Sequence, residues 1–410
     1  MTRDVDAIVR NGLCIGCGLC ESIAGSEKLK MTMTVEGRLR PSVRQALSPR
    51  TIDQIYEVCP GIRVEGFARM DFGASFRTDA LWGQAARMVS GYASDPEVRF
   101  RAASGGALTA LSLYLLESGK VEFILHVSAS KDYPMRSKAH LSFNRTQVLE
   151  GAGSRYGPVA PLVDLCRLLS QGRPFAFVGK PCDIAAVRNL AKVDPRVDKC
   201  VRYLLTLVCG GASELTLSHD IVGRFGLKED EVSLLRYRGH GCPGPTRVEA
   251  KDGRAFEESY NTIWADESGW RLQSRCKICP DATGEQADIA VSDVWPGGAP
   301  QGEDAGFNGF LARTPKGAEL LAQAERAGVV CLERSITFRD MDLFQPHQVV
   351  KKRAIVARLL GRALAGQMMP HFRRLNLLRA AMGADIAFNI GNCVGTFKRA
   401  LRGKTGEPPA

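Results

Sequence analysis

The sequence lacks any apolar run long enough to cross a membrane. A spanning helix needs roughly 18 or more apolar residues, and the richest stretches, such as ALTALSLYLL (residues 107–116), stop after about ten. The opening MTRDVDAIVRNGLC also lacks the apolar centre of a signal peptide. We therefore expect a cytoplasmic protein without a membrane-spanning helix.

The cysteines lack an even number for complete disulfide pairing, because there are 13 of them. A chain of 410 residues can bury a core that needs no crosslinks. In a reducing compartment, clustered thiols more often bind metal than form disulfides. We therefore examine the cysteines as metal ligands.

Acidic residues are scarce at the C-terminal end. Residues 351–410 hold 12 Lys and Arg against two acids, so this tail carries +10 of the net charge of +11. It has too few aromatic residues for a nucleic-acid stacking platform, so we expect no nucleic-acid partner. Apolar residues at helical spacing (Ile355, Leu359, Leu360 and Leu364) allow this helix to lie on an anionic membrane, to dock an acidic partner, or to pack on its own domain.

The order of predicted elements indicates α/β and α+β architecture. Strand-like runs such as VEFILHV, PFAFVG and RYLLTLVC alternate with helical patterns, which predicts a mostly parallel sheet covered by helices. Shorter runs rich in Gly and Pro follow and predict an α+β lobe. We expect a compact N-terminal module (1–65), a linker (66–98), a central α/β region (99–227), the α+β lobe (228–345) and a basic helical tail (346–410).

The motif CIGCGLC places Cys14, Cys17 and Cys20 at the C-x2-C-x2-C spacing. This spacing wraps three thiolates around a [4Fe-4S] cluster, whose fourth ligand comes from elsewhere and precedes a proline. Cys59, followed by Pro60, fits that role. Zinc is the alternative, but structural zinc sites usually use two separated cysteine pairs. The spacing predicts a ferredoxin-like [4Fe-4S] module.

A second cysteine pair, Cys276 and Cys279, is a redox dithiol, half of a zinc site or half of a second cluster site. Cys182 and Cys209 each follow a predicted parallel strand, at the sheet edge where ligands collect. We expect a second cluster held by Cys182, Cys276, Cys279 and either Cys209 or Cys242, because spacing does not choose between the last two.

Together these residues resemble the coenzyme F420 hydrogenase/dehydrogenase β subunit family. That family includes the β subunits of F420-reducing hydrogenase and F420-linked formate dehydrogenase, and reductases of chlorophyll-type tetrapyrroles. The resemblance is carried, in order, by CIGCGLC, RAASGGALTALSLYLLESG, GSRYGP, FVGKPCDIAAVRNL, LVCGG, RYRGHGCPG and RCKICPDATGEQADIAVSDVW.

The resemblance implies an iron–sulfur flavoprotein with FAD and two [4Fe-4S] clusters. Electrons would enter from a ferredoxin-like donor or a partner subunit and leave as hydride to coenzyme F420 or an organic acceptor such as a tetrapyrrole. A non-catalytic electron-relay subunit of a larger oxidoreductase is the alternative, and a zinc-stapled binding protein is a third possibility.

Two glycine-rich motifs are candidate FAD contacts under this resemblance. SGG opens a predicted helix, where free amides favour a pyrophosphate, although a plain helix cap explains it as well. GSRYGP offers a hydroxyl, a cation and a ring to the flavin, or forms a surface turn. The candidate residues are Ser104, Gly105, Gly106, Ser154, Arg155 and Tyr156.

Four further residues have candidate roles near the flavin. Lys180 would stabilise an anionic reduced flavin, or is a solvated loop lysine. Arg238 and His240 are candidates for anion binding and proton donation, since His titrates near neutral pH. Asp293 is expected to face inward and to order the cluster loop or a flavin hydroxyl.

Overall fold

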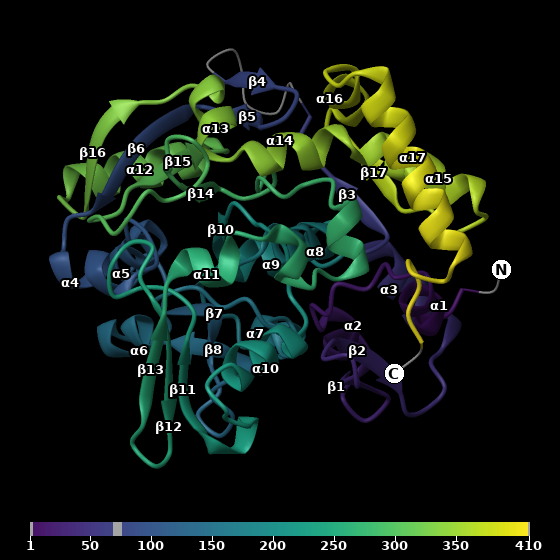
Figure 1. Cartoon of the computed structure of the whole chain (residues 1–410), viewed down its shortest axis with the longest axis horizontal. Helices are drawn as coiled ribbons and strands as arrows, with labels where there is room; N and C mark the ends of the chain where they lie inside the picture. Colours follow the sequence, from purple (N-terminus) through teal and green to yellow (C-terminus); the bar gives the residue numbers. More distant parts are fainter. Residues whose placement is uncertain (1–2, 69–75, 409–410) are drawn as a thin grey trace.

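The computed structural model describes residues 3–68 and 76–408 and is built around one eight-stranded sheet (Figure 1). The strand order is β16-β6-β15-β14-β10-β9-β7-β8. The middle strands β14, β10, β9 and β7 are parallel to one another, and antiparallel strands flank them on both sides. The strands are β6 (Arg87–Ala93), β7 (Phe123–Ala129), β8 (Ser137–Ser142), β9 (Phe175–Gly179), β10 (Val201–Leu207), β14 (Ile289–Asp293), β15 (Asn308–Ala312) and β16 (Val330–Ser335).

The central strands are apolar on both sides because helices cover both faces of the sheet. Ala176 and Leu205 face a core shared with α5 (Ala107–Glu117) and α12 (Pro315–Arg326). Phe177 and Leu204 face the opposite core, which contains α7 (Leu165–Ser170), α8 (Pro181–Ala191) and α9 (Arg196–Cys200). The prediction of a covered sheet with parallel strands is confirmed at this level.

The sheet extends beyond the region 99–227. β6 lies in the stretch expected to be a linker, and β14, β15 and β16 come from the stretch expected to form a separate lobe. β15 pairs antiparallel with both β14 and β6, so strands that are distant in sequence belong to one continuous sheet. α4 (Pro96–Arg101), α6 (Arg145–Glu150) and the small hairpin of β4 (Arg77–Asp79) and β5 (Gly83–Ala85) complete this part of the chain.

The N-terminal residues form a small module with its own apolar core, in which Ile8, Leu13 and Ile55 are buried. Its elements are α1 (Val5–Arg10), α2 (Leu19–Ala24), β1 (Leu29–Met33), β2 (Leu39–Val43), α3 (Pro49–Val58) and β3 (Arg63–Glu65). β3 pairs in parallel with β17 (His371–Arg373), so the C-terminal segment completes the module.

A three-stranded meander projects from the main sheet (Figure 1). It consists of β11 (Val232–Arg236), β12 (Thr246–Ala250) and β13 (Ala255–Glu258), and it packs on α10 (Leu215–Gly223) and α11 (Tyr260–Trp264). Short 3-10 turns occupy Glu229–Glu231, Glu267–Trp270 and Ser274–Ile278.

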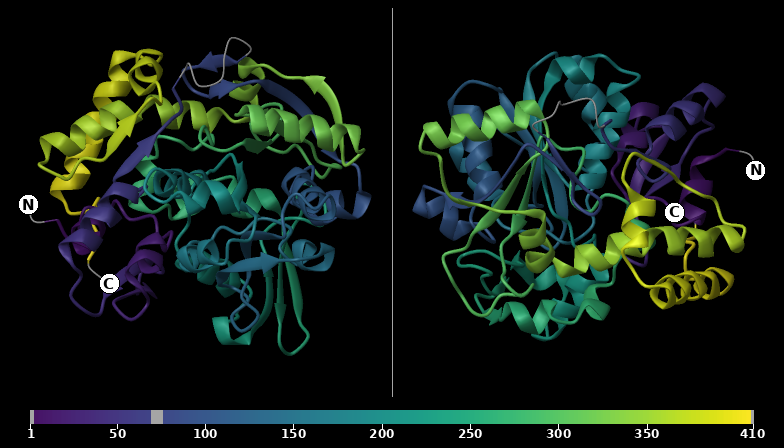
Figure 2. Two further views of the ribbon diagram at one scale, coloured as in Figure 1. Left: turned by 180° about the vertical axis from the view of Figure 1, so that it is seen from behind. Right: turned by 90° about the horizontal axis from the view of Figure 1, so that it is seen from above.

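The C-terminal segment is helical, with a break after Pro370 that contains β17. Its helices are α13 (Phe338–Phe344), α14 (Pro346–Arg353), α15 (Ile355–Leu364), α16 (Leu377–Met382) and α17 (Ile386–Leu401). Figure 2 shows them running from the main sheet to the N-terminal module. Within the described ranges, no helix is long and apolar enough to cross a membrane.

Candidate functional site

The first thiol group comprises Cys14, Cys17, Cys20 and Cys59, which lie close enough to act on one another's pKa. Burial raises the pKa of Cys17 and Cys20 well above the ordinary value, and each is raised further by neighbouring thiols, including that of Cys59. Burial and the nearby Cys14 raise the pKa of Cys59 to about 11. Clustered buried thiols of this kind ionise readily only when a cation or metal compensates their charge.

Local backbone geometry explains why the loop needs glycine. Gly16 and Gly18 have φ values of 74° and 83°, which side chains rarely adopt. A Cβ on Gly18 would also lie 2.5 Å from Val163. The amide of Gly16 donates to the Cys14 sulfur at 3.4 Å, so the loop turns its backbone toward the thiols.

The second thiol group comprises Cys182, Cys209, Cys276 and Cys279. Cys182 follows β9 at the start of α8, and Cys209 follows β10, so both lie at the carboxyl edge of parallel strands. Burial raises the pKa of Cys209 to about 12, and Cys276 and Cys279 act in the same direction. Burial raises the pKa of Cys182 well above its ordinary value, followed by Asp183 and then by Cys209 and Cys279, while Lys180 opposes the shift.

Cys242 lies apart from this group. Burial raises its pKa to about 12, and the charged groups that act on it are Asp293, Arg238 and Asp304 rather than other thiols. The structure therefore groups Cys209, not Cys242, with Cys182, Cys276 and Cys279.

In the ranges 3–68 and 76–408, no three His, Cys, Asp or Glu side chains are set to hold a single metal ion. Zinc would draw its thiolates to about 2.3 Å from one centre. A [4Fe-4S] cluster takes four cysteine thiolates, and each of the two thiol groups contains four cysteines.

Two buried arginines lie between the thiol groups. Arg40 is fully buried, and both Cys14 and Cys276 act on its pKa, which is raised although burial opposes this. Arg275 is 2% exposed and donates to the carbonyls of Pro60 (3.0 Å) and Ile278 (3.2 Å), each next to a cysteine. The two thiol groups therefore lie close to each other, and the two arginines lie near both of them.

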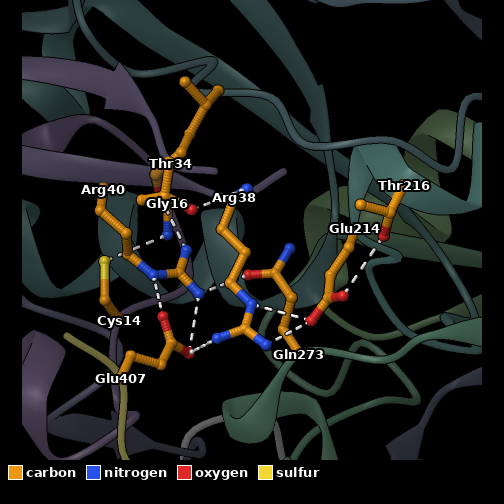
Figure 3. A network of polar contacts seen from close by, with 10 residues as sticks. Cys14, Gly16, Thr34, Arg38, Arg40, Glu214, Thr216, Gln273 and Glu407 are labelled. Atoms are coloured by element: carbon orange, nitrogen blue, oxygen red, sulfur yellow. Dashed lines mark hydrogen bonds and ion pairs between the residues drawn. The ribbon is translucent and has the colours of Figure 1, made fainter. Parts of the chain in front are cut away.

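Figure 3 shows how Arg40 is held. Its Nε donates to Glu407 Oε2 at 2.6 Å, and its Nη2 donates to Glu407 Oε1 at 3.0 Å and to Gln273 Oε1 at 2.9 Å. Arg38 also pairs with Glu407, at 3.3 Å, and with Glu214. A residue close to the C-terminus thus closes a polar network beside the first thiol group.

A large cavity opens beside the second thiol group. Its volume is about 310 Å³, and Cys209 is part of its wall. Pockets of this class hold organic cofactors and substrates. Of the residues expected near a flavin, the wall contains Ser104, Gly106, Ser154, Arg155, Tyr156, Lys180, Arg238 and Asp293.

The two glycine-rich motifs differ in their freedom to bind a ligand. The SGG turn leads into α5 with Gly106 as the N-cap, where the Ala107 amide already donates to Asn308 Oδ1 at 3.0 Å. Gly105 is absent from the cavity wall, and a Cβ there would lie 2.9 Å from the Asn308 amide. Arg155 donates to the carbonyls of Leu235 (2.8 Å) and Pro134 (2.9 Å), so its guanidinium braces the fold.

Arg238 and Lys180 supply positive charge to the cavity. Arg238 is 4% exposed and pairs with Asp293 at 3.0 Å. Burial alone would lower the pKa of Arg238, but Asp293 and the hydroxyls of Tyr156 and Tyr260 hold it above the ordinary value. Burial also opposes the charge on Lys180, whose pKa is nevertheless raised, chiefly by Asp183 at 2.7 Å.

His240 does not line this cavity. It is exposed, has a φ of 60°, and its ring lies 5.3 Å from that of Phe100. His347 from α14 does line the cavity, and burial lowers its pKa to about 4, so it is neutral near pH 7.

Of the aromatic residues in the cavity wall, Tyr156 was predicted from the sequence, whereas Tyr260, Trp264 and Trp295 were not. The Tyr156 and Trp264 rings are in contact, tilted by 35° with centroids 4.0 Å apart, while Tyr260 and Trp295 flank Arg238 at 5.1 and 5.0 Å. The four-residue spacing of Tyr260 and Trp264 on a short helix could have indicated that they share a face.

Comparisons with known proteins agree with this architecture. Residues 88–167 match the family model for the coenzyme F420 hydrogenase/dehydrogenase beta subunit N-terminus, and residues 172–336 match the model for its C-terminus. The chain resembles subunit beta of F420-dependent formate dehydrogenase 1 from Methanococcus maripaludis, with 28% identity over 58% of this chain and 59% of that protein.

Two further likenesses cover more of the chain. Coenzyme F420 hydrogenase subunit beta of Methanococcus voltae is 23% identical over 69% of this chain and 97% of its own length. A chain of the F420-reducing [NiFe] hydrogenase complex from Methanosarcina barkeri matches with a TM-score of 0.51 and 22% identity, covering 68% of this chain and 96% of that one. The chain thus spans more than nine tenths of these two but only 59% of the formate dehydrogenase subunit.

Proposed function

The chain belongs to the coenzyme F420 hydrogenase/dehydrogenase beta subunit family, and we propose that it is an iron–sulfur flavoprotein oxidoreductase. Electrons from a ferredoxin-like donor or a partner subunit would pass through two [4Fe-4S] clusters to FAD. The acceptor would take them as hydride and would be coenzyme F420 or an organic molecule such as a chlorophyll-type tetrapyrrole.

One observation carries the proposal: two groups of four buried or half-buried thiols lie side by side, and the second borders the cavity. Each group has the donor set of a [4Fe-4S] cluster. Four thiolates give such a cluster a negative charge, which buried cations must offset. Arg40 and Arg275 lie beside the first group, and Lys180 and Lys351 lie beside the second.

The cavity has the chemistry to hold FAD. The Nε atom of Arg238 and the Oδ1 atom of Asp183 are buried in its wall without a hydrogen-bond partner. Such groups are costly unless a ligand or water satisfies them. The contacting Tyr156 and Trp264 rings offer an aromatic surface to a planar ring. When bound, the clusters carry single electrons and FAD pairs them for hydride transfer.

The residues of the chain have distinct roles in this proposal. Lys180 and Arg238 keep their protons and hold positive charge at the cavity wall, where they favour an anionic ligand. Asp293 orients the Arg238 guanidinium through the 3.0 Å ion pair. His347 is neutral near pH 7, and its Nε2 lies 2.9 Å from Gln348 Nε2, from which it can accept a hydrogen bond. Because His240 lies outside the cavity, we do not include it in the chemistry.

A non-catalytic electron-relay subunit is the second candidate. The similar hydrogenase and formate dehydrogenase chains are named as subunits, which favours a partner oxidoreductase. The two candidates differ in turnover: an enzyme reduces an added acceptor with reduced ferredoxin alone, whereas a relay subunit needs its partner.

Iron and sulfide analysis of the anaerobically reconstituted protein tests the cluster proposal. We expect about eight irons per chain, a broad absorbance shoulder and bound FAD. A double Cys14→Ser and Cys59→Ser variant should lose half of the iron, and so should Cys276→Ser with Cys279→Ser. Cys242→Ser is the matched control and should keep all of it. Colourless protein with one or two zinc ions would refute the proposal.

A further inference from the structure

The C-terminal helices expose a row of large apolar side chains. Helix α17 has 16 residues, yet Thr396 is its only buried one. Ile386, Ile390 and Val394 are 78%, 58% and 42% exposed. They are four residues apart, so they share one face of the helix. We call the row formed by Leu378, Met382, Ile386, Ile390, Val394 and Leu401 the C-terminal apolar row.

This row differs from the apolar pattern that the sequence indicated on residues 355–364. In the structure Ile355 is fully buried, and α15 packs against α17, where a Cβ on Gly361 would meet the Thr396 side chain at 3.1 Å. α15 therefore packs within the protein, although Leu360 and Leu364 remain exposed. Figures 1 and 2 show α16 and α17 together with α15 at one end of the molecule.

The row is accompanied by unpaired positive charge. Arg379, Lys398, Arg402 and Lys404 are exposed, and none forms an ion pair within the described ranges. The one acidic residue between 377 and 404 is Asp385, whose carboxylate is used to cap α17 at the Phe388 amide. Lys398 lies four residues after Val394, so basic residues border the apolar face.

From this combination we propose that α16 and α17 bind the surface of an anionic lipid bilayer. A helix with one apolar face and a basic border lies in the membrane interface, where apolar burial and attraction to anionic headgroups act together. From Ile386 to Leu401 the row extends for about 22 Å along the helix axis. No helix crosses the bilayer in this arrangement.

Two other occupants fit the observations less well. A second copy of the chain would bring two sets of unpaired cations together, which opposes association. A protein partner usually engages Trp, Tyr or Arg anchors, whereas the six residues of the row are all aliphatic or Met. The inference concerns lipid binding alone and does not depend on clusters or flavin.

Sedimentation of the full chain with vesicles tests the proposal. Vesicles of phosphatidylcholine with about one third phosphatidylglycerol should pellet the protein, and pure phosphatidylcholine should bind it at least tenfold more weakly. Ile386→Ser with Ile390→Ser should weaken binding to the anionic vesicles at least tenfold, as should Lys398→Gln with Arg402→Gln. Val35→Ser, which removes an exposed apolar side chain elsewhere, is the matched control and should bind as the wild type does.

Three results would overturn the proposal. The wild type could fail to bind anionic vesicles, or the Ile386 and Ile390 double variant could bind as tightly as the wild type. Light scattering could show a dimer that the double variant abolishes, which would assign the row to a second copy. Circular dichroism of each variant distinguishes lost binding from lost folding. Because the substituted residues are exposed, we expect every variant to keep the wild-type spectrum.

Discussion

Glu407 should contribute to stability far more than its place near the C-terminus suggests. It is 2% exposed at its side chain and forms a two-pronged ion pair with the fully buried Arg40, at 2.6 and 3.0 Å. Glu407→Ala would leave the Arg40 charge buried with weaker partners. Removing one member of a buried pair costs about 3–5 kcal/mol. Arg40 keeps its bonds to Gln273 and the Leu39 carbonyl, so we expect about 3 kcal/mol.

Urea unfolding followed by circular dichroism measures this cost as a loss in the free energy of unfolding. Glu319→Ala is the control, because its pair with Arg326 is exposed at 61% and 71% and should be worth less than about 1 kcal/mol. If Glu407→Ala destabilises the protein no more than Glu319→Ala does, the tail does not brace the first thiol group and the reasoning fails.

Three further predictions concern the clusters, the cavity and pH. Arg275→Met should lower the midpoint potentials of both clusters by roughly 40–90 mV, the equivalent of about 1–2 kcal/mol for a nearby charge. Anaerobic redox titration measures these potentials, and Arg275→Lys, which keeps the charge, should show most of the wild-type values. Unchanged potentials in Arg275→Met would contradict the prediction. Arg238→Met should weaken FAD binding at least tenfold by fluorescence titration, whereas His240→Ala should not, and equal effects would count against the cavity. Burial lowers the pKa of His126 from 6.5 to about 4, so the unfolded chain binds the extra proton between these values and stability falls as the pH falls. His126 alone should contribute a loss of about 2 kcal/mol between pH 7 and pH 5. Urea titrations at both pH values should therefore show a loss about 2 kcal/mol smaller for His126→Gln than for the wild type, and an equal loss would contradict the assignment.

The sequence predicted the parts of the molecule that depend on local pattern. β9 and β10 are short apolar runs, and Cys182 and Cys209 follow within three residues of their ends. The strands and the placement of these cysteines at the carboxyl edge of the sheet could therefore be predicted together. The C-x2-C-x2-C loop is local as well, and its glycines adopt the left-handed conformations that the turn requires.

Long-range pairing could not be predicted in the same way. β15 joins β6 across more than 200 residues, and nothing in either strand identifies the other. Arg40 meets Glu407 across 367 residues, and a lone arginine on a short strand gives no sign of its partner. The choice between Cys209 and Cys242 also required coordinates, because both follow plausible strand ends and only packing separates them.

The C-terminal segment contacts residues beside both thiol groups, although the region that matches the family models ends at residue 336. Lys351 donates to the Gly210 carbonyl at 2.9 Å beside Cys209, and Arg362 donates to the Asn11 carbonyl at 2.8 Å beside the first loop. Glu407 then closes the network at Arg40. One segment therefore braces both thiol groups and carries the C-terminal apolar row. Glu407, which binds Arg40 beside the first thiol group, lies only six residues after the end of α17 at Leu401. A bilayer bound at the C-terminal apolar row would therefore hold the first thiol group close to the membrane surface.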